Sequence, residues 1–206
     1  MFIHLNTHSM YSEMSGLLPL KKLIQLSKVG GMGSLALTDV NCLSGFINFV
    51  KYCNSMEVKP IAGTNLVTKD EDIIVLVENQ IGYENLCRIV SKLHDNANQK
   101  ASDMIITYSS GLFILTENYS VLKQLKPIIT NTHLFIELRP GGCEFEARKL
   151  SKKLQLEIIA TGNVYFQNMS DYESYIMLQA IKKNSTLNEV IKENDRSKLN
   201  WFRNEE

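Results

Sequence analysis

Two histidines near the start of the chain stand in the run His4-Leu5-Asn6-Thr7-His8. Side chains on a strand alternate between its two faces, so positions 4, 6 and 8 are expected to point the same way. A neutral imidazole is a good ligand for Zn²⁺-like ions, whereas an Asn carbonyl is a much weaker one. The run therefore has the form of a metal-binding strand that lacks a ligand at Asn6.

Polar residues follow two further apolar segments in the same manner. Asp39 comes directly after the run Ser34–Thr38, and Asn65 comes just after Pro60-Ile61-Ala62. If these segments are neighbouring parallel strands of a barrel, their carboxyl ends converge on one face. The sequence therefore predicts that His8, Asp39 and Asn65 lie near a common site.

The elements that must position these residues alternate between strand and helix. Apolar residues at helical spacing predict helices at 17–26, 46–53, 83–93, 121–125 and 144–154, with another beginning after Asp171. Short apolar runs predict strands at 2–5, 34–38, 58–62, 73–77, 112–115, 134–138 and 156–160. This alternation predicts an α/β fold, specifically a distorted (β/α)7-type barrel with parallel strands that could be incomplete at the C-terminus.

Composition narrows the function classes. The 206 residues include 22 basic and 22 acidic side chains, and this neutral balance does not indicate a nucleic-acid binder. Cys42, Cys53, Cys87 and Cys143 form no Cys-x-x-Cys pair and are expected to be buried free thiols, which suits a reducing cytoplasm. The sequence shows neither an apolar run long enough for a membrane span nor a signal peptide pattern.

Several motifs together resemble the polymerase and histidinol phosphatase (PHP) domain at the N-terminus of bacterial DNA polymerase III alpha subunits. That family typically reads His-Leu-His-x-His-Ser-x-Tyr-Ser, then Ala-Leu-Thr-Asp-His-Gly, Lys-Pro-Ile-x-Gly-x-Glu and Gly-Tyr-x-Asn-Leu. This chain has the corresponding segments 4–12, 36–41, 59–65 and 82–86, in the same order and at similar spacing. Segment 160–166 is similar to the family's Ala-Thr-Asn-Asp-Val-His-Tyr, and the chain looks shortened between these ends.

The departures from the family pattern fall on the positions that resemble a trinuclear metal site. Of those positions, only His8 and Asp39 keep a side chain that binds a metal well. The others carry replacements that bind a metal poorly or not at all: Asn6, Ser15, Val40, Asn65, Asn163 and Tyr165. Close divalent ions need several carboxylates and four to six ligands each, so the sequence predicts a polar pocket without a cofactor and without catalytic residues. His4 is expected to be a structural or surface residue.

The resemblance implies a PHP-like barrel at residues 1–191, followed by a polar, loosely ordered tail at 192–206 that could begin a linker to polymerase regions. The expected function is a metal-free structural or docking domain of a bacterial DNA polymerase III alpha subunit involved in DNA replication. Its expected partners are the remaining polymerase regions in cis, a proofreading exonuclease, and DNA through the parent polymerase. Two alternatives stay open: a metal-dependent phosphoesterase or 3′–5′ exonuclease with Zn²⁺ or Mn²⁺ held weakly by His8 and Asp39, and a stand-alone binding module.

Overall fold

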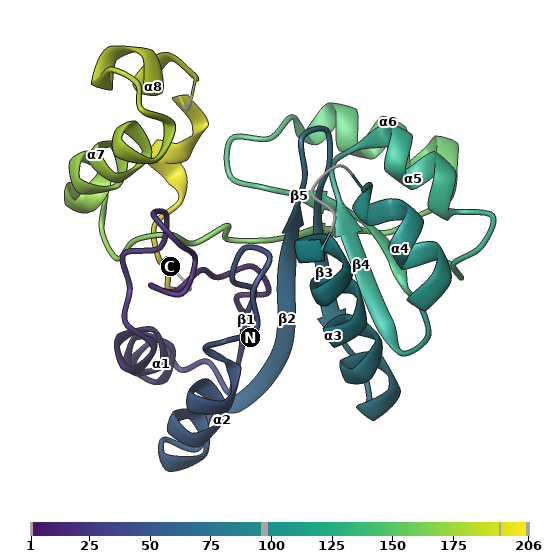
Figure 1. The fold of residues 1–206 in the computed structure, drawn as a ribbon, viewed down its shortest axis with the longest axis horizontal. Coiled ribbons are helices and arrows are strands. Elements are labelled where there is room, and N and C mark those ends of the chain that lie inside the picture. Colours follow the sequence, from purple (N-terminus) through teal and green to yellow (C-terminus); the bar gives the residue numbers. More distant parts are fainter. Residues whose placement is uncertain (1, 96–98, 194, 205–206) are drawn as a thin grey trace.

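The computed structural model describes residues 2–95, 99–193 and 195–204, which form a curled sheet flanked by helices (Figure 1). The strands are hydrogen-bonded in their sequence order. They are β1 (Ser34–Leu37), β2 (Lys59–Val67), β3 (Asp72–Val77), β4 (Leu112–Thr116), β5 (Leu134–Leu138) and β6 (Ile158–Ala160). The sheet curls into part of a barrel, which confirms the α/β barrel-like fold expected from the sequence.

One strand departs from the expected parallel arrangement. β1 and β2, β4 and β5, and β5 and β6 pair in parallel, but β3 runs antiparallel to both β2 and β4. The cause is local: residues 68–71 make a tight polar turn, in which the Thr68 N–H donates to the Glu71 carbonyl over 2.9 Å. A turn this short can join only antiparallel neighbours. The beginning of β3, at Asp72, therefore lies at the carboxyl ends of β4 and β5.

The first residues do not form the regular strand expected at 2–5, and residues 5 and 6 form a bend. Only Thr7 makes a ladder contact, an isolated parallel bridge to Val164. The N–H groups of Ala36 and Thr38 donate to the carbonyls of His4 and Thr7, over 3.0 and 2.9 Å. The segment therefore lies between β1 and the chain after β6, and it closes the curled sheet on that side.

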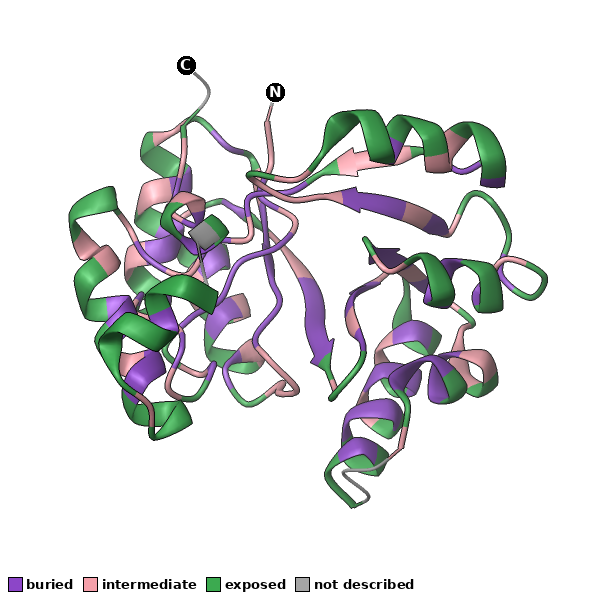
Figure 2. Ribbon diagram, turned by 90° about the horizontal axis from the view of Figure 1, so that it is seen from above, coloured by how far each residue is buried: buried purple, intermediate pink, exposed green. Residues whose placement is uncertain are grey.

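The helices are α1 (Leu20–Val29), α2 (Phe46–Ser55), α3 (Gln80–Asp95), α4 (Ala101–Tyr108), α5 (Tyr119–Leu125), α6 (Glu144–Leu154), α7 (Tyr172–Lys183) and α8 (Leu187–Glu193). The first six pack against the outside of the sheet, whereas α7 and α8 lie to one side of it and contact each other (Figure 1). The exposed faces of the helices contrast with the mostly buried strands in Figure 2. Neither α4 nor α8 was predicted from the sequence. α4 is only eight residues long, and the N-terminal N–H of Ser102 is capped from outside the helix by the Glu71 carboxylate.

Apolar side chains fill both surfaces of the sheet. The strand residues Ala36, Ile74, Leu76 and Leu115 pack inside the curl. A larger cluster joins β3, β4 and β5 to α3, α4, α5 and α6, and a second joins β1 to α1 and α2. These two clusters hold the strands in place and so fix the positions of the polar residues at the strand ends.

The C-terminal segment packs against the barrel, in contrast to the loosely ordered tail expected from Lys192 onward. Residues Asp195–Leu199 form a 3-10 helix, Trp201 makes an isolated bridge to Phe166, and Phe202 is only 5% exposed. The carbonyl of Arg203 accepts a hydrogen bond from His4 Nε2 over 2.9 Å. Phe202 is a core residue and Trp201 packs partly buried against the core, roles that the polar composition of the segment hides. A domain boundary at residue 191 stays a prediction.

Two smaller expectations can be compared with the structure. All four cysteines are free, as expected, but only Cys53 is buried, and Cys143 is exposed at the start of α6. In the described part of the chain, no helix has the length and apolar character needed to cross a bilayer.

Candidate functional site: a charge-compensated strand-end cluster

Asn6 occupies the centre of a hydrogen-bonded cluster at the barrel mouth. Its side chain is fully buried. The amide nitrogen donates to Glu137 Oε1 over 2.8 Å and to Asn163 Oδ1 over 3.3 Å, while Thr38 Oγ1 donates to the amide oxygen over 3.2 Å. Asn6 therefore acts as a bridge between polar groups of three segments. A histidine at this position could not make all three contacts, because a neutral imidazole has one donor and one acceptor nitrogen.

His8 and Tyr165 stack face to face, with ring centroids 3.9 Å apart and an interplanar angle of 14°. His8 is fully buried, and its Nδ1 lies 3.5 Å from Ser12 Oγ, whereas its Nε2 has no hydrogen-bond partner among the described residues. Burial lowers the pKa of His8 to about 3, so the ring is neutral at physiological pH. The pair fills space with aromatic surface at a place where the resemblance implied two metal ligands.

Asp39 is held by neutral donors. Both of its carboxylate oxygens are engaged: Oδ1 accepts from the Ser9 N–H (2.7 Å) and Ser12 Oγ (2.6 Å), and Oδ2 accepts from Ser9 Oγ (2.8 Å). Burial raises the pKa of Asp39, and these hydrogen bonds oppose that rise only in part. The carboxylate therefore anchors the loop after His8 to the end of β1.

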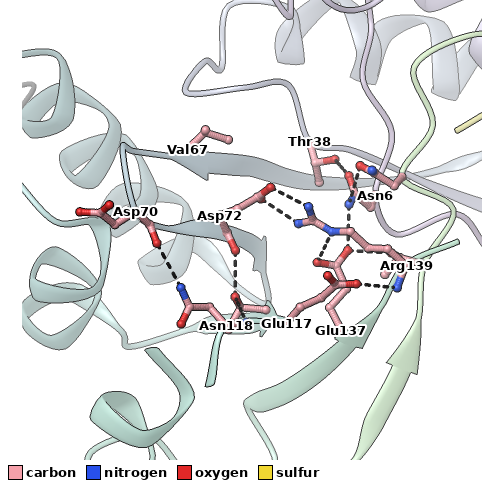
Figure 3. A network of polar contacts seen from close by, with 12 residues as sticks. Asn6, Thr38, Val67, Asp70, Asp72, Glu117, Asn118, Glu137 and Arg139 are labelled. Atoms are coloured by element: carbon pink, nitrogen blue, oxygen red, sulfur yellow. Dashed lines mark hydrogen bonds and ion pairs between the residues drawn. The ribbon is translucent and has the colours of Figure 1, made fainter. Parts of the chain in front are cut away.

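Arg139 carries the strongest electrostatic contacts of the cluster (Figure 3). Its Nη1 and Nη2 donate to the two oxygens of Asp72 over 2.6 and 2.7 Å, and its Nε donates to Glu137 Oε2 over 2.8 Å. The other oxygen of Glu137 accepts from Asn6 and from Thr161 Oγ1, the latter over 2.7 Å. One guanidinium thus joins two carboxylates from different strands, and its contact with Asp72 has the bidentate geometry that makes such pairs strong.

The pKa shifts show how the three charges share this site. Burial would raise the pKa of Asp72, but the hydrogen bonds and charge of Arg139 outweigh it and lower that pKa. For Glu137, whose side chain is 0% exposed, burial dominates and the pKa is raised despite Arg139, Thr161 and Asn6. Burial disfavours the charge of Arg139, yet the two carboxylates raise its pKa above the usual value. The guanidinium is therefore the permanent charge of the cluster.

The remaining positions named from the sequence fall into two groups. Asn65 on β2 is buried and forms an isolated bridge with Val40, so both lie next to the end of β1. Ser15 lies elsewhere: its hydroxyl accepts hydrogen bonds from Gln179 and Lys182 of α7, over 3.2 and 3.0 Å. The structure therefore brings Asn6, His8, Asn163 and Tyr165 together and attaches Ser15 to a helix.

The residues present do not fit a multinuclear metal centre. Among the described residues, no group of three or more His, Cys, Asp or Glu side chains is placed to hold a metal ion. The carboxylates of Asp72 and Glu137 are bound by the Arg139 guanidinium, and those of Asp39 by serines. Among the described residues, His8 Nε2 and His4 Nδ1 are buried imidazole nitrogens without a hydrogen-bond partner, and two imidazoles without a free carboxylate cannot hold several divalent ions.

Asp72, Glu137 and Arg139 were not singled out from the sequence, although one signal was available. Glu137 interrupts the apolar strand Leu134–Leu138, and a buried charge needs a partner. Arg139 follows two residues later and so projects on the same side of the strand. Asp72 gives no such signal, because in an all-parallel barrel the start of a strand lies at the opposite end from the carboxyl ends.

The fold and the strand-end cluster define an α/β barrel of the type that places polar residues at the carboxyl ends of its strands. The model of the PHP domain matches residues 4–167, and the chain belongs to this family.

Curated relatives extend the match over the whole chain. It is 26% identical to the DNA polymerase III subunit alpha of Haemophilus influenzae and 27% identical to that of Escherichia coli K12, with 100% of this chain covered in both. The Bacillus subtilis subunit is 25% identical over 92% of this chain. The chain spans only about a fifth of the length of these relatives. The Haemophilus alignment extends over 238 positions although the chain has 206 residues, so this chain is shorter than its relative there.

Solved structures share the fold at low sequence identity. A putative metal-dependent phosphoesterase from Bifidobacterium adolescentis has a TM-score of 0.54 at 10% identity, covering 78% of this chain and 86% of that one. An amidohydrolase from Chromobacterium violaceum has a TM-score of 0.55, also at 10% identity, covering 79% and 87%. These likenesses establish the barrel architecture alone.

Proposed function

We propose that this chain is a non-catalytic PHP domain that serves as a structural or docking part of a DNA polymerase III alpha subunit. The observation that carries the proposal is the Arg139 guanidinium bound to both Asp72 and Glu137. A cation supplied by the protein occupies two strand-end carboxylates that could otherwise bind a metal ion. The replacements Asn6 and Tyr165 support the same conclusion, because each makes a specific contact in the cluster.

The partners and location belong to the same proposal. The relatives named as alpha subunits are about five times longer than this chain, which supports contacts with further polymerase regions in cis. A proofreading exonuclease and DNA, reached through the parent polymerase, are proposed on the resemblance alone. A cytoplasmic location follows from the same reasoning.

Metal content and hydrolysis test this proposal together. The purified chain is incubated with Zn²⁺ or Mn²⁺, desalted and analysed by mass spectrometry for bound metal, and then assayed on phosphate monoesters and on a 3′-labelled single strand. We expect far less than one ion per chain and no metal-dependent hydrolysis. Stoichiometric metal with hydrolysis would overturn the proposal.

A matched variant shows whether the assay could detect a working centre. It restores the family pattern with Asn6→His, Val40→His, Asn65→Glu, Asn163→Asp and Tyr165→His, and replaces Arg139→Ala to free the carboxylates. We expect this variant to retain more metal than the wild-type chain. Equal metal retention by the two proteins would mean that the replaced residues do not account for the missing metal.

The second candidate is a metal-dependent phosphoesterase or exonuclease with an atypical site. The observation that favours it is His8 Nε2, a buried, neutral imidazole nitrogen with no hydrogen-bond partner in the part of the chain that the structure describes. Hydrolysis that requires Mn²⁺ or Zn²⁺ and that is abolished by both His8→Ala and Asp39→Ala would establish this candidate. Hydrolysis that survives both changes would point to a contaminant.

A further inference from the structure

We propose that Arg139 is a built-in cation covering a latent cation-binding site, which Asp72 and Glu137 would form if the guanidinium were removed. This inference rests on the proposed function, because it takes the wild-type cluster to be metal-free. It goes further by assigning the missing positive charge to one side chain. It also predicts which small ions could replace that side chain.

The contact geometry separates Arg139 from an ordinary surface ion pair. Three guanidinium nitrogens are used, over 2.6, 2.7 and 2.8 Å, and the side chain is 16% exposed. By contrast, Arg148 and Glu144 pair one helical turn apart with side chains 69% and 62% exposed. Water can solvate the second pair, but it cannot reach the 0% exposed side chain of Glu137.

The Glu137 carboxylate and the backbone of Asp72 are held in place by contacts that do not depend on Arg139. Glu137 Oε1 accepts hydrogen bonds from Asn6 and Thr161, and the backbone of Asp72 is fixed by the ladder of β3 and by a 2.8 Å hydrogen bond from Thr116 Oγ1 to its carbonyl. Removing the guanidinium should therefore leave both carboxylates facing the same space. Two negative groups around one gap are a site for a cation.

A route from solvent to this space exists. A cavity of about 520 Å³ is lined by Asp72, Arg139, Asn163 and Tyr165, together with residues of the C-terminal segment. The Asp72 side chain is 43% exposed, so an ion that enters the cavity can reach this carboxylate. Both the guanidinium ion, which has the shape of the missing group, and a divalent ion are small enough for such a cavity.

The test asks whether added cations restore the stability of the Arg139→Ala variant. Thermal unfolding measures the stability, and isothermal titration calorimetry measures the binding of the cation. Loss of one partner of a buried ion pair should lower Tm by about 10 °C. Guanidinium or Mn²⁺ at low millimolar concentration should then raise the Tm of the variant along a saturable curve. The same additions should leave the wild-type Tm unchanged after correction with equal ionic strength of NaCl.

Two control variants define the site. Arg148→Ala removes an arginine from the exposed pair and should show no saturable response. Arg139→Ala combined with Glu137→Gln removes the buried counter-charge as well, and it should lose most of the rescue. A merely structural role for Arg139 would lower Tm without any ion-specific recovery, so the rescue curve separates the two explanations.

Each outcome decides the matter. Saturable rescue confined to Arg139→Ala supports the proposal, and so does a variant that folds only when refolded with guanidinium or Mn²⁺. Absence of saturable binding, or failure to fold with the cations as well as without them, overturns it. Metal bound stoichiometrically by the wild-type chain would instead overturn the proposed function, so the two failures are distinguishable.

Discussion

The barrel mouth holds two clusters with buried carboxylates, and the negative charge is stabilised by different groups in each. Asp39 is 2% exposed and is satisfied by a backbone N–H and two hydroxyl groups. Asp72 and Glu137 share a guanidinium, with an amide and a hydroxyl completing the contacts of Glu137. Neutral donors suffice for one carboxylate, but two nearby carboxylates repel each other and require a positive charge. The difference explains why an arginine appears at only one of the clusters.

The two clusters also differ in what they connect. The Asp39 cluster ties the loop at 9–12 to the end of β1. The Arg139 cluster joins β3 to β5, and through Asn6 and Thr161 it reaches the N-terminal segment and the chain after β6. The second cluster therefore braces most of the curled sheet, and damage to it should have the larger effect on stability.

Replacement of Arg139 gives the largest expected effect. Arg139→Met keeps most of the apolar stem but leaves Glu137 buried beside Asp72 without a cation, which should lower the free energy of unfolding by about 3–5 kcal/mol. Urea unfolding at pH 7 measures it. Arg148→Met is the matched control, and its exposed pair should contribute less than about 1 kcal/mol. Similar losses of unfolding free energy in both variants would mean that the Arg139 cluster contributes no more to stability than an exposed ion pair.

The next largest effect is expected on acidification, which should lower the stability of the fold through two buried, neutral histidines. Burial lowers the pKa of His8 to about 3 and that of His4 to about 4, so the unfolded chain takes up these protons first as pH falls below the ordinary value of 6.5. Each histidine therefore costs about 2 kcal/mol of stability between pH 7 and pH 5.

The measurement is urea unfolding of the wild type and His8→Gln at both pH values. The variant should lose about 2 kcal/mol less than the wild type over this range. His133→Gln is the control, because its half-buried side chain lies outside the site. A His8→Gln variant whose loss equals that of the wild type would show that His8 does not oppose protonation in the fold.

The sequence was enough to predict which residues lie together where their proximity follows from the order of the strands. Asn6, His8, Asn163 and Tyr165 meet because the N-terminal segment lies beside the chain after β6, as a barrel requires. The motif spacing also predicted the family. These inferences depend on alternation and on strand ends, which are local properties of the sequence.

The missed residues depend on long-range geometry. Asp72 reaches the cluster only because β3 is antiparallel, and its contact with Arg139 spans 67 positions of the sequence. Ser15 turned toward α7, whose lysine and glutamine offered donors that the motif pattern could not reveal. The packing of Trp201 and Phe202 likewise depends on apolar clusters formed by distant segments.

Asp39→Asn tests the neutral cluster itself. The amide keeps the shape of the carboxylate but turns one acceptor into a donor, which faces Ser9 and Ser12. Because burial raises the pKa of Asp39 and so already disfavours its charge, removal of that charge offsets part of the lost hydrogen bonding. We expect a loss of about 1–2 kcal/mol in urea unfolding, below that of Arg139→Met. A loss equal to or above that of Arg139→Met would reverse the proposed ranking of the two clusters.

Ser12→Ala gives the smallest expected effect and shows how much of the stability of the neutral cluster comes from one hydroxyl group. Ser12 Oγ donates to Asp39 over 2.6 Å and accepts from the Val40 N–H over 3.1 Å, so its removal should cost about 1 kcal/mol. Combined with Asp39→Asn in a double-mutant cycle, it should show a coupling energy of about 0.5–1 kcal/mol, because each change removes the same hydrogen bond. The cycle of Ser12→Ala with Arg148→Ala provides a distant pair that should be additive. Additivity between Ser12 and Asp39 would mean that the serine hydroxyl contributes mainly through Val40, and that the carboxylate is held by Ser9 alone.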